Sequence, residues 1–171
     1  MVTAAAPISI AEYLNSDYEP DAEYIDGVLE DRNVGQKKHS ETQGLLIAYL
    51  LARKVQHRHR VLPEQRVRIS PSRVRIPDIC LVSRDDKDEV TQRPPVLWIE
   101  ILSPEDRWSR IQSKLSDVLR FGVDTVWIVD PYSNQAWIAT QHNPAHEVLD
   151  GRLRCETLEL EIPISEILPE E

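Results

Sequence analysis

The chain has 171 residues, of which 41% are hydrophobic and 29% charged, and its formal net charge is −9 at pH 7. This length and composition predict one globular domain over residues 1–171, with a buried core. The acidic balance argues against a protein that coats nucleic acid nonspecifically, because phosphate binding depends on cationic side chains.

The cysteines and the hydropathy of the chain indicate its compartment. Cys80 and Cys155 lack the spacing of metal ligands, and we interpret both as reduced thiols. No stretch reaches the roughly 18 consecutive apolar residues of a membrane helix. Residues 1–6 lack the basic start and apolar centre of a signal peptide. We therefore expect a cytoplasmic protein without a membrane partner.

Charge is unevenly distributed along the chain. Residues 1–31 contain eight acidic and no basic residues, whereas residues 32–75 contain eleven basic and two acidic ones. Basic residues of this middle segment include Arg53, Lys54, Arg58, Arg60, Arg66, Arg68, Arg73 and Arg75. The segment either lines a phosphate-facing surface or is a solvated helix end followed by a charged edge strand, and the sequence leaves both open.

The N-terminal part predicts a short helix and then a β-hairpin. Ser9 and Glu12 form a capping-box pattern, which should open a helix that ends near Asn15. Asp26-Gly27 is a dipeptide that strongly favours a tight turn between antiparallel strands. The two strands of this hairpin are expected over residues 22–25 and 28–32.

The longest helix is predicted after the hairpin. Ser40 with Gln43 is a second capping-box pattern that should open it, and the helix is expected to end near Gln56. Its apolar residues recur at helical spacing: Leu45, Leu46, Tyr49, Ala52 and Val55.

The second half of the chain predicts strands around one further helix. Strands are expected over residues 61–69, 74–83, 96–102 and 126–129. A helix over residues 109–121, closed by Gly122, separates the last two, so we expect a right-handed crossover into a parallel pair. Edge strands and a final turn should follow Trp137. The pattern predicts an α/β fold with a central mixed sheet flanked by helices and an N-terminal hairpin.

Two carboxylates in apolar surroundings point to a metal. Glu100 interrupts the otherwise apolar strand VLWIEIL, where a buried charge costs several kcal/mol unless something compensates it. Asp78 follows Pro77 at the entrance to a second apolar strand. Carboxylates on neighbouring strands can share one hard cation, because Mg²⁺ needs only one or two protein carboxylates.

Lys114 borders the buried stripe of the second predicted helix, three residues after Ile111 and four before Val118. Its ammonium group can point toward the strand that precedes the helix, where it would balance a developing phosphorane charge or orient a water. Asp, Glu and Lys around one metal suit phosphodiester hydrolysis. The alternative is that Glu100 and Lys114 form a buried ion pair without chemistry.

Several segments together match one known pattern. They are Pro77-Asp78, residues 100–104 (EILSP), Lys114, residues 121–123 (FGV) and residues 126–131 (VWIVDP). The combination resembles the Uma-two family, which was long a domain of unknown function and is assigned to the PD-(D/E)XK nuclease superfamily. Glu23 before the Asp-Gly turn and His39 at the start of the long helix extend the resemblance over most of the chain.

The resemblance implies a restriction-endonuclease-like core and a metal-dependent endonuclease that hydrolyses phosphodiester bonds of DNA with Mg²⁺ or Mn²⁺. It implies Asp78, Glu100 and Lys114 as catalytic residues, with the two carboxylates as metal ligands. Glu23 and His39 are additional candidates. The superfamily pattern places a lysine two residues after the Glu, where this chain has Leu102; in the resembled family the following helix supplies it, which matches Lys114.

Two further expectations complete the sequence-based hypothesis. A homodimer is expected from the resemblance, since a domain of this size cannot enclose a duplex and a two-fold partner would address the second strand. Trp108 precedes the candidate helix and is the tryptophan considered for base stacking, whereas Trp98, Trp127 and Trp137 are expected in the core. The rival hypothesis is a catalytically degenerate nuclease fold retained as an interaction module, which agrees with the acidic net charge and the lack of a separate DNA-reading domain.

Overall fold

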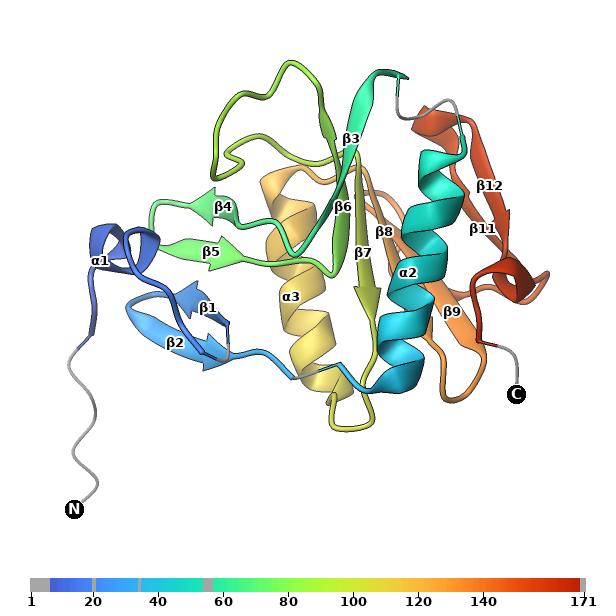
Figure 1. Cartoon of the computed structure of the whole chain (residues 1–171), viewed down its shortest axis with the longest axis horizontal. Helices are drawn as coiled ribbons and strands as arrows, with labels where there is room; N and C mark the ends of the chain where they lie inside the picture. Colours follow the sequence, from blue (N-terminus) through green and yellow to red (C-terminus); the bar gives the residue numbers. More distant parts are fainter. Residues whose placement is uncertain (1–6, 20, 34, 54–56, 170–171) are drawn as a thin grey trace.

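The computed structural model describes residues 7–19, 21–33, 35–53 and 57–169 (Figure 1). The helices are α1 (Ile10–Leu14), α2 (Lys37–Leu51) and α3 (Trp108–Phe121). The central sheet has the strand order β10-β9-β8-β7-β6-β3. Its strands are β3 (His59–Pro63), β6 (Ile79–Ser83), β7 (Leu97–Ile101), β8 (Thr125–Asp130), β9 (Gln135–Thr140) and β10 (His146–Glu147).

Two smaller sheets flank the central one. The N-terminal sheet has the order β2-β1-β5-β4, and a separate hairpin pairs β11 with β12. The strands of the N-terminal sheet are β1 (Ala22–Ile25), β2 (Val28–Asp31), β4 (Val67–Ser70) and β5 (Arg73–Arg75). The C-terminal hairpin consists of β11 (Arg152–Cys155) and β12 (Leu160–Pro163). The N-terminal sheet projects from the body beside α3, and β11–β12 lie at the opposite end (Figure 1).

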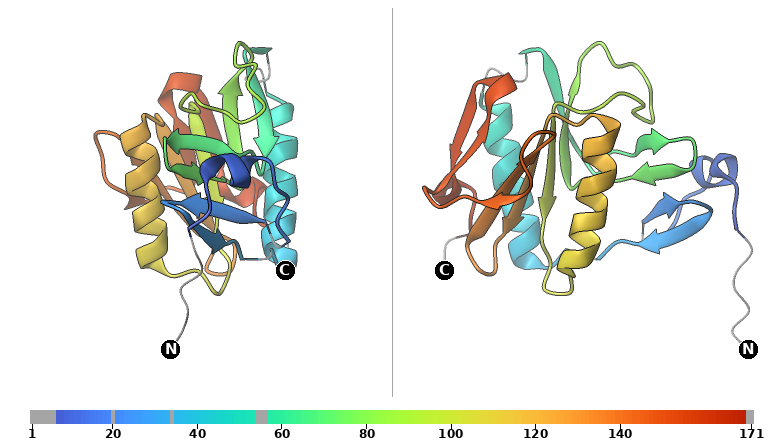
Figure 2. Two further views of the ribbon diagram at one scale, coloured as in Figure 1. Left: turned by 90° about the vertical axis from the view of Figure 1, so that its left-hand side faces the viewer. Right: turned by 180° about the vertical axis from the view of Figure 1, so that it is seen from behind.

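The central sheet is covered by α3 on one face and α2 on the other (Figure 2). Successive residues of a strand point to opposite faces, so neighbouring positions of β7 belong to different cores. Ile99 packs in a cluster with Leu50 of α2, whereas Trp98 packs in a cluster with Ile111 of α3. Burial on both faces explains why β7 reads as an almost continuous apolar run.

The strand-helix-strand prediction is confirmed. β7 and β8 are parallel neighbours, with Glu100 opposite Ile128, while the other pairs of the central sheet are antiparallel. Helix α3 ends at Gly122, whose φ of +114° lies in the left-handed region that glycine tolerates. The predicted hairpin also forms, and positive φ values at Asp26 and Gly27 make its tight turn.

The predicted boundaries of the long helix are wrong at its start. α2 begins at Lys37 with Gln36 as N-cap, so Ser40 and Gln43 lie inside the helix and form no capping box. The Gln43 amide instead donates to the Asp78 carbonyl, at 2.9 Å. This tertiary contact outweighs the local capping pattern. The described helix ends at Leu51, and the predicted end near Gln56 lies outside the described residues, as do Val55 and Lys54.

Two long predicted strands are each divided between two sheets. The segment predicted over residues 61–69 forms β3 and β4, and that over 74–83 forms β5 and β6. Glu64 adopts a φ of +50°, which ends the first strand, and Pro77 lacks the N–H that a continuous ladder needs. The second break places Asp78 where the chain enters the central sheet.

The basic middle segment does not form one uncompensated phosphate-facing surface. Arg66 pairs with Asp21, and Arg73 pairs with Asp26 and Asp117. Arg75 is 3% exposed and forms ion pairs with the buried carboxylates of Glu23 and Asp117. The acidic N-terminal residues therefore neutralise part of the basic run. No helix among the described residues is long and apolar enough to cross a membrane.

Candidate active site

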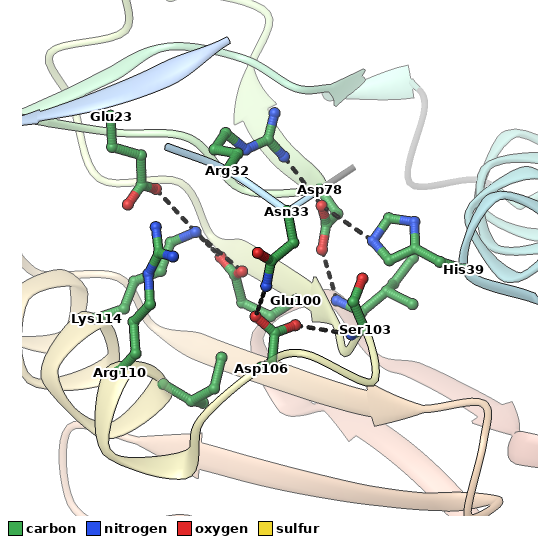
Figure 3. A pocket seen from close by; sticks show the side chains of 12 residues that line it. Glu23, Arg32, Asn33, His39, Asp78, Glu100, Ser103, Asp106, Arg110 and Lys114 are labelled. Atoms are coloured by element: carbon green, nitrogen blue, oxygen red, sulfur yellow. Dashed lines mark hydrogen bonds and ion pairs between the residues drawn. The ribbon is translucent and has the colours of Figure 1, made fainter. Parts of the chain in front are cut away.

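A cavity of about 50 Å³ opens between the start of β6, the end of β7, helix α3 and the N-terminal hairpin (Figure 3). Its polar lining includes all five residues that the sequence proposed for the site: Glu23, His39, Asp78, Glu100 and Lys114. The structure therefore brings together residues from two sheets and two helices.

Asp78 directly precedes β6 and Glu100 lies on β7, and these two strands are antiparallel neighbours. β6 and β7 pair Ile79 with Ile99, and continuing this register places Asp78 opposite Glu100. Asp78 is 6% exposed, and its Oδ2 accepts a hydrogen bond from the backbone N–H of Ile101 at 2.6 Å. Its Oδ1 accepts from Arg32 at 3.0 Å. The backbone bond fixes Asp78 against the residue that follows Glu100.

Glu100 is held inside the strand by two donors. The Trp98 indole N–H donates to Oε1 at 2.5 Å, and the Lys114 ammonium donates to Oε2 at 2.9 Å. Burial raises the pKa of Glu100 to about 7, which Lys114 opposes and the negative charge of Asp78 reinforces. The charged form of Glu100 is therefore costly in this pocket without a further cation.

Lys114 lies at the centre of the charged groups. Its ammonium donates to the backbone carbonyl of Ile76 at 2.8 Å and also contacts Glu23 Oε1 at 2.9 Å and Glu100 Oε1 at 2.8 Å. The residue is 9% exposed, so these partners replace most of its water. Its position three residues after Ile111 on α3 delivers the ammonium group to the end of β7. Lys114 therefore supplies the positive charge that the superfamily pattern places at the position of Leu102.

A second buried ion network supports Lys114 from the hairpin side. Glu23 accepts from the Ile76 backbone N–H at 2.9 Å and from Arg75 at 2.7 Å. Arg75 also binds Asp117 of α3, at 2.8 Å. Burial alone would raise the pKa of Glu23, but Lys114 and Arg75 beside it lower the pKa to about 2. Glu23 is thus a stable anion that holds Lys114 in place.

His39 contacts Asp78 from α2. Its Nε2 lies 3.4 Å from Asp78 Oδ1, and its Nδ1 is buried without a hydrogen-bond partner among the described residues. Burial opposes protonation of His39, but its hydrogen bond and charge interaction with Asp78 raise its pKa. The imidazole therefore positions the Asp78 carboxylate together with Arg32.

Several residues at this pocket were not anticipated from the sequence. Arg32, Asn33, Asp106 and Arg110 also line it. The Asn33 amide donates to Asp106 at 2.7 Å, which joins the β2–α2 connection to the loop before α3. Arg32, Asn33 and Asp106 lie in connections without periodicity, and Arg110 lies in the first turn of α3, where nothing in the local sequence distinguishes it from a solvated arginine. Trp98 could have been predicted as a neighbour of Glu100, because residues two apart in a strand point to the same face of the sheet.

The donor set fits a hydrated divalent cation. Among the described residues no group of three His, Cys, Asp or Glu is arranged to hold a metal, but Mg²⁺ keeps several waters and needs only one or two carboxylates. Asp78 Oδ2 and Glu100 Oε2 each accept one hydrogen bond from described residues, which leaves each an acceptor position. A cavity of about 50 Å³ also has room for several waters, at roughly 10–15 Å³ each.

Comparison with known families agrees with this architecture. The sequence profile of the Uma2 (Uma-two) family, described as "Putative restriction endonuclease", matches residues 10–167. The chain belongs to the Uma2 family. The match covers the hairpin, both long helices and the central sheet, so this Uma2 protein carries all elements that form the pocket. No curated protein sequence matches the chain significantly.

A solved structure shares the fold. A crystal structure from Anabaena variabilis ATCC 29413, described as "a putative nuclease belonging to DUF820", superposes with a TM-score of 0.82. The two chains are 22% identical, and the superposition covers 94% of this chain and 97% of the other. This likeness confirms the expected fold class, a central mixed sheet flanked by helices with an N-terminal hairpin.

Proposed function

We propose that this Uma2 protein is a metal-dependent endonuclease that hydrolyses phosphodiester bonds of DNA, with Mg²⁺ or Mn²⁺ as cofactor. The observation that carries the proposal is the convergence of Asp78, Glu100 and Lys114 at one open pocket. A nuclease family and a nuclease-like fold support the same reaction class. The three catalytic residues are assigned as part of this proposal.

Each pocket residue has a role in this mechanism. Asp78 and Glu100 would hold the cation, which when bound supplies Lewis acidity and a more acidic water. The Lys114 ammonium group would stabilise negative charge that develops on the phosphate during attack by water. Glu23 holds that ammonium group in place, and His39 holds the Asp78 carboxylate.

The pocket also contains cations suited to a phosphate. Arg32 and Arg110 line the same cavity as Lys114. Arg32 is held by Asp78, whereas Arg110 is half-buried and donates to the Asp31 carbonyl at 2.6 Å. Because a guanidinium group offers donors in a fixed fork, either can bind non-bridging phosphate oxygens. Hydrolysis adds water across one P–O bond, and the departing oxygen receives a proton from solvent.

One observation favours the rival function, a catalytically degenerate interaction module. Protein cations already bind both candidate metal ligands, since Lys114 contacts Glu100 and Arg32 contacts Asp78. A closed network of ion pairs is also what a purely structural site would contain. Metal binding separates the two functions, because the rival requires none.

Calorimetry with Mg²⁺ and Mn²⁺, followed by cleavage assays on single- and double-stranded DNA and RNA, tests the proposal. Wild type should bind metal and cleave DNA. The variants Asp78→Asn and Glu100→Gln should each lose metal binding and DNA cleavage. Glu161→Gln, an exposed carboxylate on β12, is the matched control and should retain them. Absence of metal binding by a folded wild type would support the interaction module instead.

We further propose that the protein acts as a cytoplasmic homodimer with two-fold symmetry, so that each copy addresses one strand of a duplex. Light scattering at micromolar concentration should give twice the mass of one chain. A monomer under those conditions would contradict the assembly without affecting the chemistry of the pocket. Fractionation of cells that express the protein tests its location.

A further inference from the structure

Two tryptophans, one exposed and one half-buried, form an aromatic pair at the start of α3. The ring centroids of Trp108 and Trp137 lie 5.4 Å apart and the rings are tilted by 52°. Trp108 is 41% exposed, although it is one of the largest apolar side chains of the protein. Trp137 is half-buried and packs against the core beneath α3. The core thus anchors one ring, while solvent reaches the other.

The strand register places this pair close to Glu100. Glu100 lies opposite Ile128 on β8, and Ile128 lies opposite Trp137 on β9. Residues directly opposite each other point to the same face of a sheet, so these three side chains form one row on the α3 side. Strands are about 4.8 Å apart, which puts Trp137 about 10 Å across the sheet from Glu100.

Helix α3 connects the aromatic pair to the pocket directly. Trp108 is the first residue of α3, and the same helix contributes Arg110, Ile111 and Lys114 to the pocket. At 1.5 Å per residue, Trp108 and Lys114 are about 9 Å apart along the helix axis. A bound nucleic-acid strand that reaches Lys114 with one phosphate can therefore reach Trp108 with a neighbouring base.

The charges around Trp108 suit a phosphate backbone. Arg107 precedes it and is exposed, and its guanidinium group makes no hydrogen bond or ion pair within the part of the chain that the structure describes. Arg110 follows it at the rim of the cavity, and the first turn of α3 contains no acidic residue. Glu105 and Asp106 lie just before Arg107, and their carboxylates accept hydrogen bonds from Gln36 and Asn33, so the two arginines are the groups here that can bind phosphate.

We infer that Trp108 and Trp137 form a stacking surface for an unpaired base of the substrate, so that the preferred substrate is single-stranded or locally unpaired DNA. Aromatic side chains stack on bases of any sequence, but only a base removed from a duplex offers a free face. The inference rests on the proposed function, because that function supplies the strand which passes Lys114.

Fluorescence anisotropy with a short fluorescein-labelled oligodeoxynucleotide tests the inference, in EDTA so that no cleavage occurs. Trp108→Ala should weaken binding of the single strand about tenfold, the size expected for one stacked base, and should weaken binding of a blunt duplex of the same sequence less than twofold. Trp108→Phe should retain most of the affinity, because it keeps an aromatic face. Leu149→Ala, at the most exposed large apolar residue, is the control and should bind as wild type does.

The outcomes separate this inference from the nuclease proposal. Equal losses for single strand and duplex, no loss in Trp108→Ala, or no binding of the single strand by wild type would each overturn the stacking surface. Cleavage with Mg²⁺ is measured separately on the same proteins. Metal-dependent cleavage that Trp108→Ala leaves intact on every substrate would retain the nuclease and refute the stacking surface. Selective binding of the single strand by wild type, lost in Trp108→Ala and without cleavage, would retain the stacking surface and refute the nuclease.

Discussion

The Lys114 ammonium group lies 2.9 Å from Glu23 Oε1, and this buried contact joins helix α3 to the N-terminal hairpin. Glu100 binds the same ammonium group, at 2.8 Å, so one lysine serves two carboxylates. The pKa values of the two carboxylates shift in opposite directions: that of Glu23 is lowered to about 2, while that of Glu100 is raised to about 7. Glu23 therefore stabilises the folded protein in its charged form, whereas the charged form of Glu100 is unfavourable in the folded protein.

Glu23→Gln should destabilise the protein by about 3 kcal/mol at neutral pH, because removing one partner of a buried ion network leaves the others uncompensated. Arg75 would keep Asp117, and Lys114 would keep Glu100. Urea unfolding followed by circular dichroism measures the loss. Glu161→Gln, on the exposed face of β12, is the control; its ion pairs with Arg152 and Arg154 are exposed to solvent, so the change should cost less than about 1 kcal/mol. Equal stability of the Glu23 variant and wild type would contradict the network.

Glu100→Gln should leave the metal-free protein unchanged or make it more stable, by up to about 3 kcal/mol above pH 7. The sign follows from a folded pKa near 7 against an ordinary value of 4.5. The folded state then binds more protons than the unfolded state, so wild type loses stability as pH rises from 4.5 to 7 and the variant does not. Thermal melting of both proteins across this range is the measurement. A loss of about 3 kcal/mol in the variant would indicate a purely structural ion pair with Lys114.

Acid should remove the contribution of Glu23. Its folded pKa of about 2 lies below the ordinary 4.5, so the stabilisation is complete above pH 4.5 and is lost as pH falls from 4.5 toward 2. The size is about 3 kcal/mol, from 1.36 kcal/mol per pKa unit. Urea midpoints measured across this range should fall more steeply for wild type than for Glu23→Gln. Parallel slopes would show that Glu23 has an ordinary pKa in the folded protein.

Two glycine substitutions should change stability in opposite directions. At Gly122 the φ of +114° is strained for any L residue, and an added Cβ would lie 3.1 Å from the Pro94 ring. Gly122→Ala should therefore destabilise the protein by about 1–2 kcal/mol. At Gly44, exposed in the middle of α2, an added Cβ meets nothing within 4 Å, so Gly44→Ala should stabilise by about 0.5–1 kcal/mol. Thermal melting compares the two variants directly, and a shift of the same sign in both would refute the backbone argument.

Local patterns in the sequence were sufficient for the elements whose signals are short-range. The Asp26-Gly27 turn, the Ser9 cap of α1 and the Gly122 end of α3 all formed where the sequence placed them. Each depends on backbone conformations available within a few residues. The apolar run around Glu100 likewise identified a strand that is buried on both faces.

Long-range contacts decided what local patterns could not. The Ser40–Gln43 pattern resembles a cap, but Gln43 bonds to the Asp78 carbonyl from within α2. Residues 74–83 look like one strand, but the chain changes sheets at Pro77. Pairing with Asp21, Asp26 and Asp117 converts arginines of the basic run into internal structure, and nothing within that run indicates these distant partners.

The sequence by itself determined which side chains could carry the chemistry, because a lone Glu in an apolar strand, an Asp at a strand entrance and a Lys beside a helix stripe are each unusual where they stand. Only the tertiary structure decided that they meet. The antiparallel register of β6 and β7 sets Asp78 opposite Glu100, and the docking of α3 brings the Lys114 ammonium group to both Glu100 and Glu23. Register and docking follow from the packing of two cores on opposite faces of one sheet, which no stretch of local sequence encodes.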